Sequence, residues 1–345
     1  MAKNNLNIAV ISCSYMAERH MEGIIAKEGA TLYAICDNAT DGRLERCREK
    51  YNVPVAVTDW RELVNDENID AAVIVTPDDL HLEMTEAFLG AGKHVLCEKP
   101  MALTLEECEK MMRAEKESGK TLMIGQVCRC TPAFVMAKNM IESGKIGELT
   151  FVESEYAHDY SKVRGYNDWR VNPRREGFIG GGCHAVDLLR WIAGNPLEVH
   201  AYANHKYLTD WPVNDTTIAI YKFPKNVIGK VFVSIGCKRS YTMRSCFYGT
   251  KGTIICDNTS STLQLFEAFD ENGNETDQTK VKELPVEVNN HNITAEIDAF
   301  IDGITGKKDI IVTSLEGASS VAVCCATVES AAKNGEAVTI KYPKI

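Results

Sequence analysis

The sequence lacks any hydrophobic run that approaches the roughly 20 residues a membrane-spanning helix needs. Its opening, MAKNNLNIAV, leads straight into an expected strand, with no apolar signal segment before it. Basic residues are in the minority, 38 against 48 acidic ones, so the net charge is −10 and a polyanion would not be neutralised. These shortages argue against a membrane span and a nucleic-acid partner. They predict a cytoplasmic protein.

Patterns typical of zinc sites and disulfide frameworks are also missing, although the chain has 13 cysteines. No paired CxxC occurs, and Cys128-Arg129-Cys130 has the wrong spacing for a zinc knuckle. Several cysteines, Cys97 and Cys246 among them, lie inside apolar runs, where cysteine behaves as a small hydrophobe. We therefore expect reduced thiols and no metal centre.

The 345 residues are enough for two domains, each with its own core. Short apolar runs alternate with amphipathic segments over the first 125 residues, which predicts βαβ units and a parallel sheet. Expected strands are 6–11, 31–36, 55–57, 71–75, 95–97 and 122–124. Expected helices are 17–27, 41–51, 80–91 and 104–119, and the last begins with a capping box at Thr104 and Glu107.

After about residue 145 the pattern changes to longer alternating segments, which predict one mostly antiparallel sheet. The expected strands are 148–158, 198–207, 216–223, 229–235, 244–248 and 253–257. Helical patterns occur at 181–193, 293–304 and 315–334, and the polar stretch 269–281 is expected to be a surface hairpin loop.

The turn after the first expected strand reads Ser12-Cys13-Ser14-Tyr15-Met16-Ala17. The dinucleotide fingerprint G-x-G-x-x-G/A falls on Ser12, Ser14 and Ala17, so both of its first glycines are absent. Asp37 ends the second strand, about 20 residues on, where an acid accepts from the adenosine ribose and repels a 2′-phosphate. Asp37 alone would fit a turn acid equally well, but the whole pattern favours NAD over NADP.

The segment His94-Val95-Leu96-Cys97-Glu98-Lys99-Pro100 is a buried strand that ends in an acid, a lysine and a proline. Residues just past the carboxyl end of such a strand face the crevice where ligands bind, so Lys99 is a candidate proton donor or acceptor. The alternative is a solvated charged turn. Thr76 and Pro77 end the preceding strand, and His81, on the next helical turn, fits a ligand role or a purely structural one.

A second group of candidates lies downstream. His184 follows three glycines at a helix entry, where a ligand or another backbone can come close, and Asp187 shares its helix face and could orient its ring. A purely structural helix pair is the alternative. Tyr156 and His158 share one face of an alternating strand, and His158, which ends it, either lines a pocket or lies at an exposed strand end. The loop 160–176 is rich in cations and aromatics, Trp169-Arg170 among them, and suits a polyhydroxylated or carboxylated ligand.

With these residues assembled, the chain resembles the Gfo/Idh/MocA oxidoreductase family over essentially its whole length. The resemblance also draws on Gly125-Gln126 with Arg129, and on Gly249-Thr250-Lys251-Gly252. It implies an NAD-binding Rossmann domain over residues 1–125. For residues 126–345 it implies a substrate-binding and oligomerisation domain of α+β type with a large open sheet. Redox chemistry on sugars or polyols is implied, with Lys99-Pro100 often cis and Lys99 in contact with nicotinamide ribose and substrate hydroxyl.

The motifs and the resemblance together indicate which residues catalyse the reaction and which bind cofactor and substrate. Expected catalytic residues are Lys99, His184 and Asp187. Expected cofactor-binding residues are Ser12, Ser14, Tyr15, Met16, Asp37, Thr76, Pro77, His81, Glu98, Lys99, Gln126, Trp169 and Arg170. Expected substrate-binding residues are Lys99, Arg129, Tyr156, His158, Arg170 and His184.

One position departs from the family. Many members carry an aspartate four residues before the histidine, where this chain has Gly180. The proton relay could instead run through Asp187, His158, Asp159 or Tyr156. Two further functions therefore stay open beside a sugar or polyol dehydrogenase: an NAD-dependent glycoside-cleaving enzyme that oxidises its substrate transiently, and a non-catalytic NAD-bound sensor. Because an open apolar sheet face seldom stays in water, we expect a homodimer or homotetramer.

Overall fold

A computed structural model describes residues 5–270, 273–277 and 279–344. The chain divides into two compact units. Of the described residues, the first unit holds those in 5–126, 292–321 and 343–344, and the second holds those in 127–291 and 322–342. The expected boundary at 125/126 lies next to this division. The return of 292–321 to the first unit was not anticipated, because a local pattern does not show which core a helix joins.

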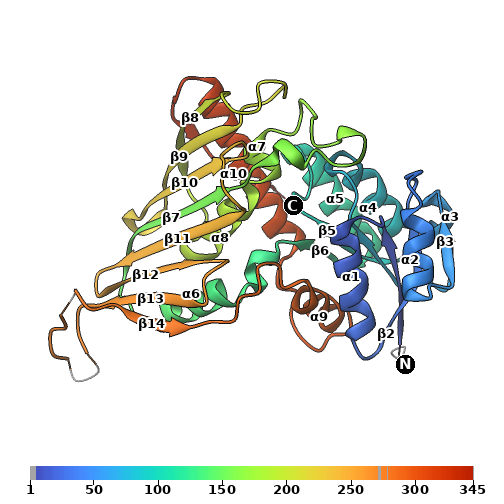
Figure 1. Ribbon diagram of the computed structural model, residues 1–345, viewed down its shortest axis with the longest axis horizontal. Coiled ribbons are helices and arrows are strands. Elements are labelled where there is room, and N and C mark those ends of the chain that lie inside the picture. The colour runs from blue at the N-terminus through green and yellow to red at the C-terminus, as the bar shows by residue number, and fades with distance from the viewer. Residues whose placement is uncertain (1–4, 271–272, 278, 345) are drawn as a thin grey trace. The chain divides into compact units, whose positions relative to one another are not determined.

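The first unit is built on a six-stranded parallel sheet in the order β3-β2-β1-β4-β5-β6, which is the Rossmann order (Figure 1). Its strands are β1 (Leu6–Ile11), β2 (Ala30–Cys36), β3 (Val55–Val57), β4 (Ala71–Ile74), β5 (His94–Glu98) and β6 (Leu122–Gly125). Its helices are α1 (Tyr15–Ala26), α2 (Arg43–Tyr51), α3 (Arg61–Val64), α4 (His81–Gly90), α5 (Leu105–Ser118) and α9 (Ile293–Ile304). A short 3-10 turn, η1 (Asp78–Leu80), precedes α4.

Local signals explain where these elements begin. Ser14 caps α1 by accepting from the Ala17 N–H, and Thr104 and Glu107 form the predicted capping box of α5. Strands β4 and β6 are buried along their whole length, as expected for a parallel sheet covered on both faces. The six predicted strands are all present, with ends that differ by at most one residue.

The second unit carries a nine-stranded sheet in the order β14-β13-β12-β11-β7-β10-β9-β8-β15 (Figure 1). Its strands are β7 (Leu149–Ala157), β8 (Glu198–Asn204), β9 (Thr216–Lys222), β10 (Ile228–Ser234), β11 (Thr242–Gly249), β12 (Gly252–Asp257), β13 (Thr262–Glu267), β14 (Lys282–Pro285) and β15 (Val338–Thr339). Only β7 and β10 pair in parallel among these described strands, so the predicted antiparallel character is confirmed.

Helices cover one face of this sheet. They are α6 (Pro132–Glu142), α7 (Gly177–Gly180) and α8 (Cys183–Ala193). The last long helix, α10 (Ser314–Ala332), spans the division between the units. Burial alternates along β9, and the other face presents Ile218, Ile220 and Tyr202 to solvent. The sheet therefore has one buried and one exposed apolar face.

Several elements were not predicted from the sequence: the helices α3, α6 and α7, the strand β13, and the two edge strands β14 and β15. The expected loop 269–281 connects the paired strands β13 and β14, although residues 271, 272 and 278 lie outside the described part of the chain. Within the described residues, no helix is long and apolar enough to cross a membrane. All 13 cysteines are described, and none forms a disulfide.

Candidate active site

The turn after β1 forms one side of the predicted cofactor cradle. Ser12 has a φ of 130°, the left-handed region that glycine adopts readily and serine does not. Its Oγ accepts from the Ser14 N–H at 3.0 Å, and Ser14 then caps α1. Ala17, at the third fingerprint position, is completely buried, so the helix packs closely on the sheet. The serine residues thus reproduce the glycine geometry at a cost in backbone strain.

Asp37 lies directly after β2 and faces this turn. Its Oδ2 accepts from the Cys13 N–H at 2.6 Å, and its Oδ1 accepts from the Ala39 N–H at 2.8 Å. The carboxylate is 9% exposed. Asp37 therefore fixes the fingerprint turn while leaving lone pairs that a ribose hydroxyl can use.

Lys99 follows β5 at the carboxyl edge of the sheet, as predicted. The Lys99–Pro100 peptide bond is cis. The Lys99 N–H donates to Glu98 Oε2 at 3.1 Å, so the acid of this short motif holds the backbone of its own lysine. Across the sheet, Glu98 pairs with Gly125, and Gln126 follows it.

His81 holds the same turn from the opposite flank. The ring is completely buried, with Nδ1 2.9 Å from the Pro100 carbonyl and Nε2 3.1 Å from the Thr76 carbonyl. Only a doubly protonated imidazole donates to both oxygens. Burial alone lowers the pKa of His81, but Cys97, Asp78 and the Pro100 carbonyl outweigh it and raise the pKa to about 10. Of the two interpretations left open for His81, the geometry favours the structural one.

Gln126 is also placed near this edge. Its side chain is 1% exposed, and neither Oε1 nor Nε2 has a hydrogen-bond partner among the described residues. A buried primary amide without partners indicates a polar ligand or ordered water. The remaining predicted cofactor residues of this unit are Tyr15, which is exposed at the start of α1, Met16, Thr76 and Pro77, which are partly buried.

In the second unit His184 lies on the first turn of α8, almost fully buried in a cluster of rings. It stacks on Tyr156 with centroids 5.9 Å apart and ring planes 11° apart. Tyr156 OH lies 2.7 Å from Tyr160 OH and 3.4 Å from His158 Nδ1. Burial, with Tyr160 and Tyr241 nearby, raises the pKa of Tyr156 well above its ordinary value. Tyr156 is therefore a neutral phenol, able to donate a hydrogen bond.

Three members of this cluster were missed by sequence reasoning. Tyr241 stacks on His291 with centroids 5.3 Å apart, and the ring of His291 lies 6.2 Å from that of His184. Cys128 Sγ lies 3.5 Å from His184 Nδ1. These residues come from separate loops and turns, and only the tertiary fold brings them together.

Asp187, the predicted orienting group, makes a two-pronged ion pair with Arg129. Arg129 Nε and Nη2 donate to its two carboxylate oxygens, each at 2.8 Å, and both side chains are buried. Arg190 Nη1 lies 3.7 Å away. The pair joins α8 to the turn after β6, so Asp187 fixes Arg129. The His184 Nδ1 atom itself lies 3.5 Å from Cys128 Sγ.

Gly180 lies at the end of α7 against a cation. A Cβ atom at Gly180 would lie 2.3 Å from the Arg175 guanidinium, which is itself 3% exposed. Arg175 and Arg170 flank the Trp169 ring at 5.0 Å and 4.4 Å. The Arg175 guanidinium therefore fills the space that an aspartate side chain at position 180 would need.

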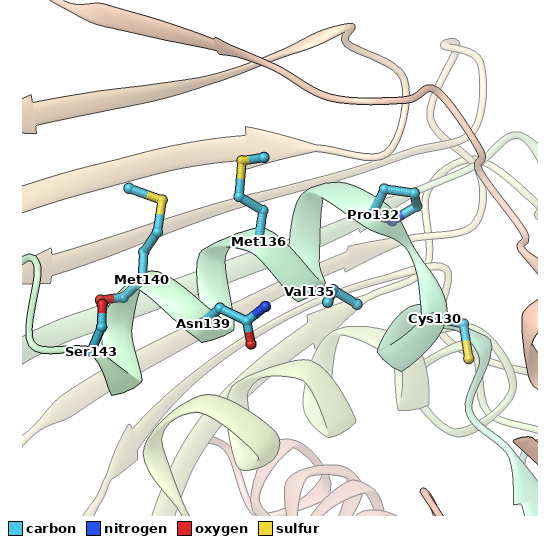
Figure 2. Close-up of a pocket in the computed structure, with 7 residues that line it drawn as sticks. All are labelled: Cys130, Pro132, Val135, Met136, Asn139, Met140 and Ser143. Atoms are coloured by element: carbon cyan, nitrogen blue, oxygen red, sulfur yellow. The ribbon is translucent and has the colours of Figure 1, made fainter.

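A surface hollow in the second unit lies apart from these residues. It has a volume of about 570 Å³ and runs along α6 (Figure 2). Its lining residues are Cys130, Pro132, Val135, Met136, Asn139, Met140 and Ser143. None of them is a predicted site residue, and acid–base groups other than the Cys130 thiol are absent from this lining, so the hollow is not a candidate for catalysis.

The parallel sheet with its serine fingerprint, Asp37 and Lys99 defines an NAD-binding oxidoreductase. Residues 6–126 match the family described as oxidoreductase family, NAD-binding Rossmann fold, and residues 134–255 match the GFO/IDH/MocA C-terminal domain. The chain belongs to the Gfo/Idh/MocA oxidoreductase family, and the predicted resemblance is confirmed.

Named relatives agree with this assignment. The chain is 30% identical to a myo-inositol 2-dehydrogenase of Thermotoga maritima over 268 residues, which cover 74% of this chain and 77% of that protein. It is 28% identical to a 1,5-anhydro-D-fructose reductase of Ensifer adhaerens, over 96% of this chain and 98% of that one. Among solved structures, a levoglucosan dehydrogenase in complex with NADH superposes with a TM-score of 0.87 at 23% identity, covering 98% of this chain and all of the other.

Proposed function

We propose that this protein transfers a hydride between the nicotinamide of NAD and a CH–OH or ketone carbon of a sugar, polyol or sugar derivative. The observation that carries the proposal is the placement of Lys99. It follows β5 at the ligand-binding edge of a Rossmann sheet, on a turn held by Glu98 and His81. Relatives named for inositol, levoglucosan and anhydrofructose support the substrate class.

The residues present fit a bound dinucleotide. The Ser12 backbone already has the φ that the fingerprint needs, α1 directs its N-terminus at the turn, and Asp37 keeps acceptor capacity for a ribose. Gln126 supplies an amide without partners among the described residues. We propose NAD rather than NADP, because a 2′-phosphate would meet the Asp37 carboxylate. When bound, the cofactor supplies a nicotinamide carbon that exchanges the hydride.

The chain's own contribution is proton transfer and positioning. We propose that Lys99 exchanges a proton with the substrate oxygen while the carbon bearing it gains or loses the hydride. We propose that His184 and Tyr156 hydrogen-bond substrate hydroxyls, and that Arg129, fixed by Asp187, orients the turn beside them. His158, Trp169 and Arg170 complete the proposed binding group.

Absorbance of NADH tests the proposal. A panel of polyols and aldoses is incubated with NAD, and the corresponding ketoses with NADH. We expect turnover with some members and at least a 100-fold loss of kcat in Lys99→Ala, because general acid–base catalysis contributes about 10²–10⁴-fold. Normal turnover in both Lys99→Ala and His184→Ala would refute the assigned roles.

A second candidate function is favoured by the contact between Gly180 and Arg175. Position 180 carries no acid, and the buried Arg175 guanidinium lies against it, which changes the proton transfers that this region supports. The alternative is cleavage of a glycoside through transient oxidation, with the hydride returned to the substrate. Product analysis on aryl glycosides distinguishes it, since that activity releases the aglycone without net formation of NADH.

We propose that the exposed face of the nine-stranded sheet associates with a second copy, giving a homodimer or homotetramer. Supporting it, Ile220, Ile228 and Tyr202 are each more than half exposed on neighbouring strands. Light scattering at micromolar concentration tests the assembly. A monomeric native protein, or an Ile220→Glu variant with unchanged mass, would refute it.

We also propose that the protein works in a reducing compartment such as the cytoplasm. All 13 cysteines are free and ten of them are buried, so they pack as apolar side chains. When the unsubstituted protein is denatured and its thiols are alkylated, mass spectrometry should show that all 13 cysteines are labelled. Incomplete labelling would contradict the proposal.

A further inference from the structure

Behind the Lys99 turn lies a cluster of three titratable side chains from three elements: His20 on α1, Glu98 at the end of β5 and Glu296 on α9. A ring nitrogen of His20 and one carboxyl oxygen of each glutamate all lie within 4.8 Å of one another. His20 and Glu296 are completely buried, and the Glu98 side chain is 12% exposed. All three belong to the first unit.

Glu98 is the charged member of the cluster. His20 Nε2 lies 3.0 Å from Glu98 Oε1, and the Lys99 N–H donates to Oε2, so both carboxylate oxygens are engaged. Burial raises the pKa of Glu98, but the His20 hydrogen bond and the Lys99 charge outweigh it and lower the pKa to about 2.

Glu296 has none of this support. Neither of its carboxyl oxygens has a hydrogen-bond partner among the described residues, and its Oε1 lies against Gly125, where a Cβ would be 3.6 Å away. A carboxylate buried without donors and beside another carboxylate is strongly disfavoured. Burial and the charge of Glu98 raise the pKa of Glu296 well above its ordinary value, and Lys99 opposes them only in part.

We propose that Glu296 is held as a neutral carboxylic acid behind the Lys99 turn, leaving Glu98 as the single negative charge of the cluster beside the lysine. The proposal rests on the proposed function for the role of Lys99. Among the described residues, the titratable and charged groups that face Glu296 are His20 from α1, Glu98 at the end of β5 and Lys99, which follows β5. From β6, Gly125 lies against Glu296 and carries no charge.

A single charge matters because a carboxylate close to an ammonium favours its protonated form. With Glu98 alone charged, one carboxylate acts on Lys99. With Glu296 also charged, two would act, and Lys99 would release its proton only at higher pH. The neutral Glu296 thus fills the buried space behind the turn without adding a second counter-ion.

The first test is the pH dependence of the melting temperature, which needs no activity. The unfolded chain releases the Glu296 proton near the ordinary value of 4.5, whereas the folded protein keeps it. Stabilisation that depends on this proton is therefore lost as pH rises above that value. Glu296→Gln has no proton to lose at this position. The melting temperature of the variant minus that of the native protein should therefore increase steadily from about pH 5 to pH 8.

Asp298→Asn is the matched control, since Asp298 lies on the same helix, is 45% exposed and faces Lys27 at 3.4 Å. Its difference from the native protein should stay constant over the same range. If the difference in melting temperature between Glu296→Gln and the native protein is also constant over this pH range, Glu296 is already ionised in the folded protein and the proposal is overturned. One equivalent of tightly bound Zn²⁺ or Mn²⁺ in the native protein that is lost in Glu296→Gln would also overturn it.

The second test is the pH profile of kcat/KM. Glu98→Gln should move the limb that depends on Lys99 to lower pH by about one unit, because the lysine loses its charged neighbour. Glu296→Gln should leave that limb in place, whatever its kcat. A shift in both variants would show that both acids are charged and would overturn the proposal. If no limb depends on Lys99, the proposed function fails, while the melting experiment still decides the state of Glu296.

Discussion

Replacing His81 should destabilise the first unit strongly. In His81→Leu the Thr76 and Pro100 carbonyls stay buried and lose their donor. Hydrogen bonds from a charged donor contribute about 1.5–3 kcal/mol each, so the loss should be about 3–6 kcal/mol. The pKa leads to a similar figure. A rise from 6.5 to about 10 corresponds to about 5 kcal/mol at 1.36 kcal/mol per unit.

The same shift fixes the pH dependence. Because the folded pKa lies above the unfolded one, this stabilisation is complete below pH 6.5 and is lost as pH rises towards 10. Urea unfolding followed by circular dichroism at pH values of about 6, 8 and 9.5 measures it. The difference between native protein and His81→Leu should shrink across the series.

Two further variants keep the experiment decisive. His81→Gln retains one donor and should lose about half as much stability, which covers the case in which His81→Leu does not fold. His200→Gln is the control, since His200 is 51% exposed and bonds a single carbonyl, that of Gly335. A pH-independent difference between native protein and His81→Gln would refute the charged ring.

Four other changes test the site. Ser12→Gly should relieve the strain of a φ of 130° and raise stability by about 1 kcal/mol in thermal unfolding, and a loss would refute that strain. In Asp37→Asn, the ratio of the NADP to the NAD dissociation constant, measured by calorimetry, should fall at least 10-fold. An unchanged ratio would contradict the ribose contact. Gly180→Ala should cost about 1–3 kcal/mol through overlap with the Arg175 guanidinium, and adding Arg175→Ala should recover part of it. Asp187→Asn should cost about 3–5 kcal/mol by breaking a buried ion pair, and a smaller loss in urea unfolding would show that Arg129 finds another partner.

The strands and longer helices of the first unit were predictable because they are specified locally, whereas the four-residue α3 was not predicted. Six apolar runs bounded by turn residues give six parallel strands, and the capping box at Thr104 places the start of α5 to the residue. Lys99 was found for the same reason, since a residue directly after a buried strand has its position fixed by the strand. The cysteine-rich turn after β6 gave no such signal, and Cys128 was missed.

The partners of His184 depend on the fold instead. The spacing of Asp187 put it on the same helix face, yet its carboxylate faces Arg129 from another segment. Tyr241 and His291 lie in segments without periodicity, so no pattern singles them out. Glu296 likewise could not be found from the sequence. A glutamate on an amphipathic helix is expected to be exposed to solvent, and only the packing of α9 buries it.

The turn that carries Lys99 is held by opposite charges on its two flanks. On one flank the charged His81 ring donates to the carbonyl of Pro100, the residue after the lysine. On the other flank Glu98, fixed by His20, accepts from the lysine's own N–H. Both holding groups act on backbone atoms, so they fix where the lysine side chain begins. Because the backbone of Lys99 is fixed in this way, the contribution of the lysine to catalysis should depend on His81 and Glu98, even though neither is proposed to exchange the proton.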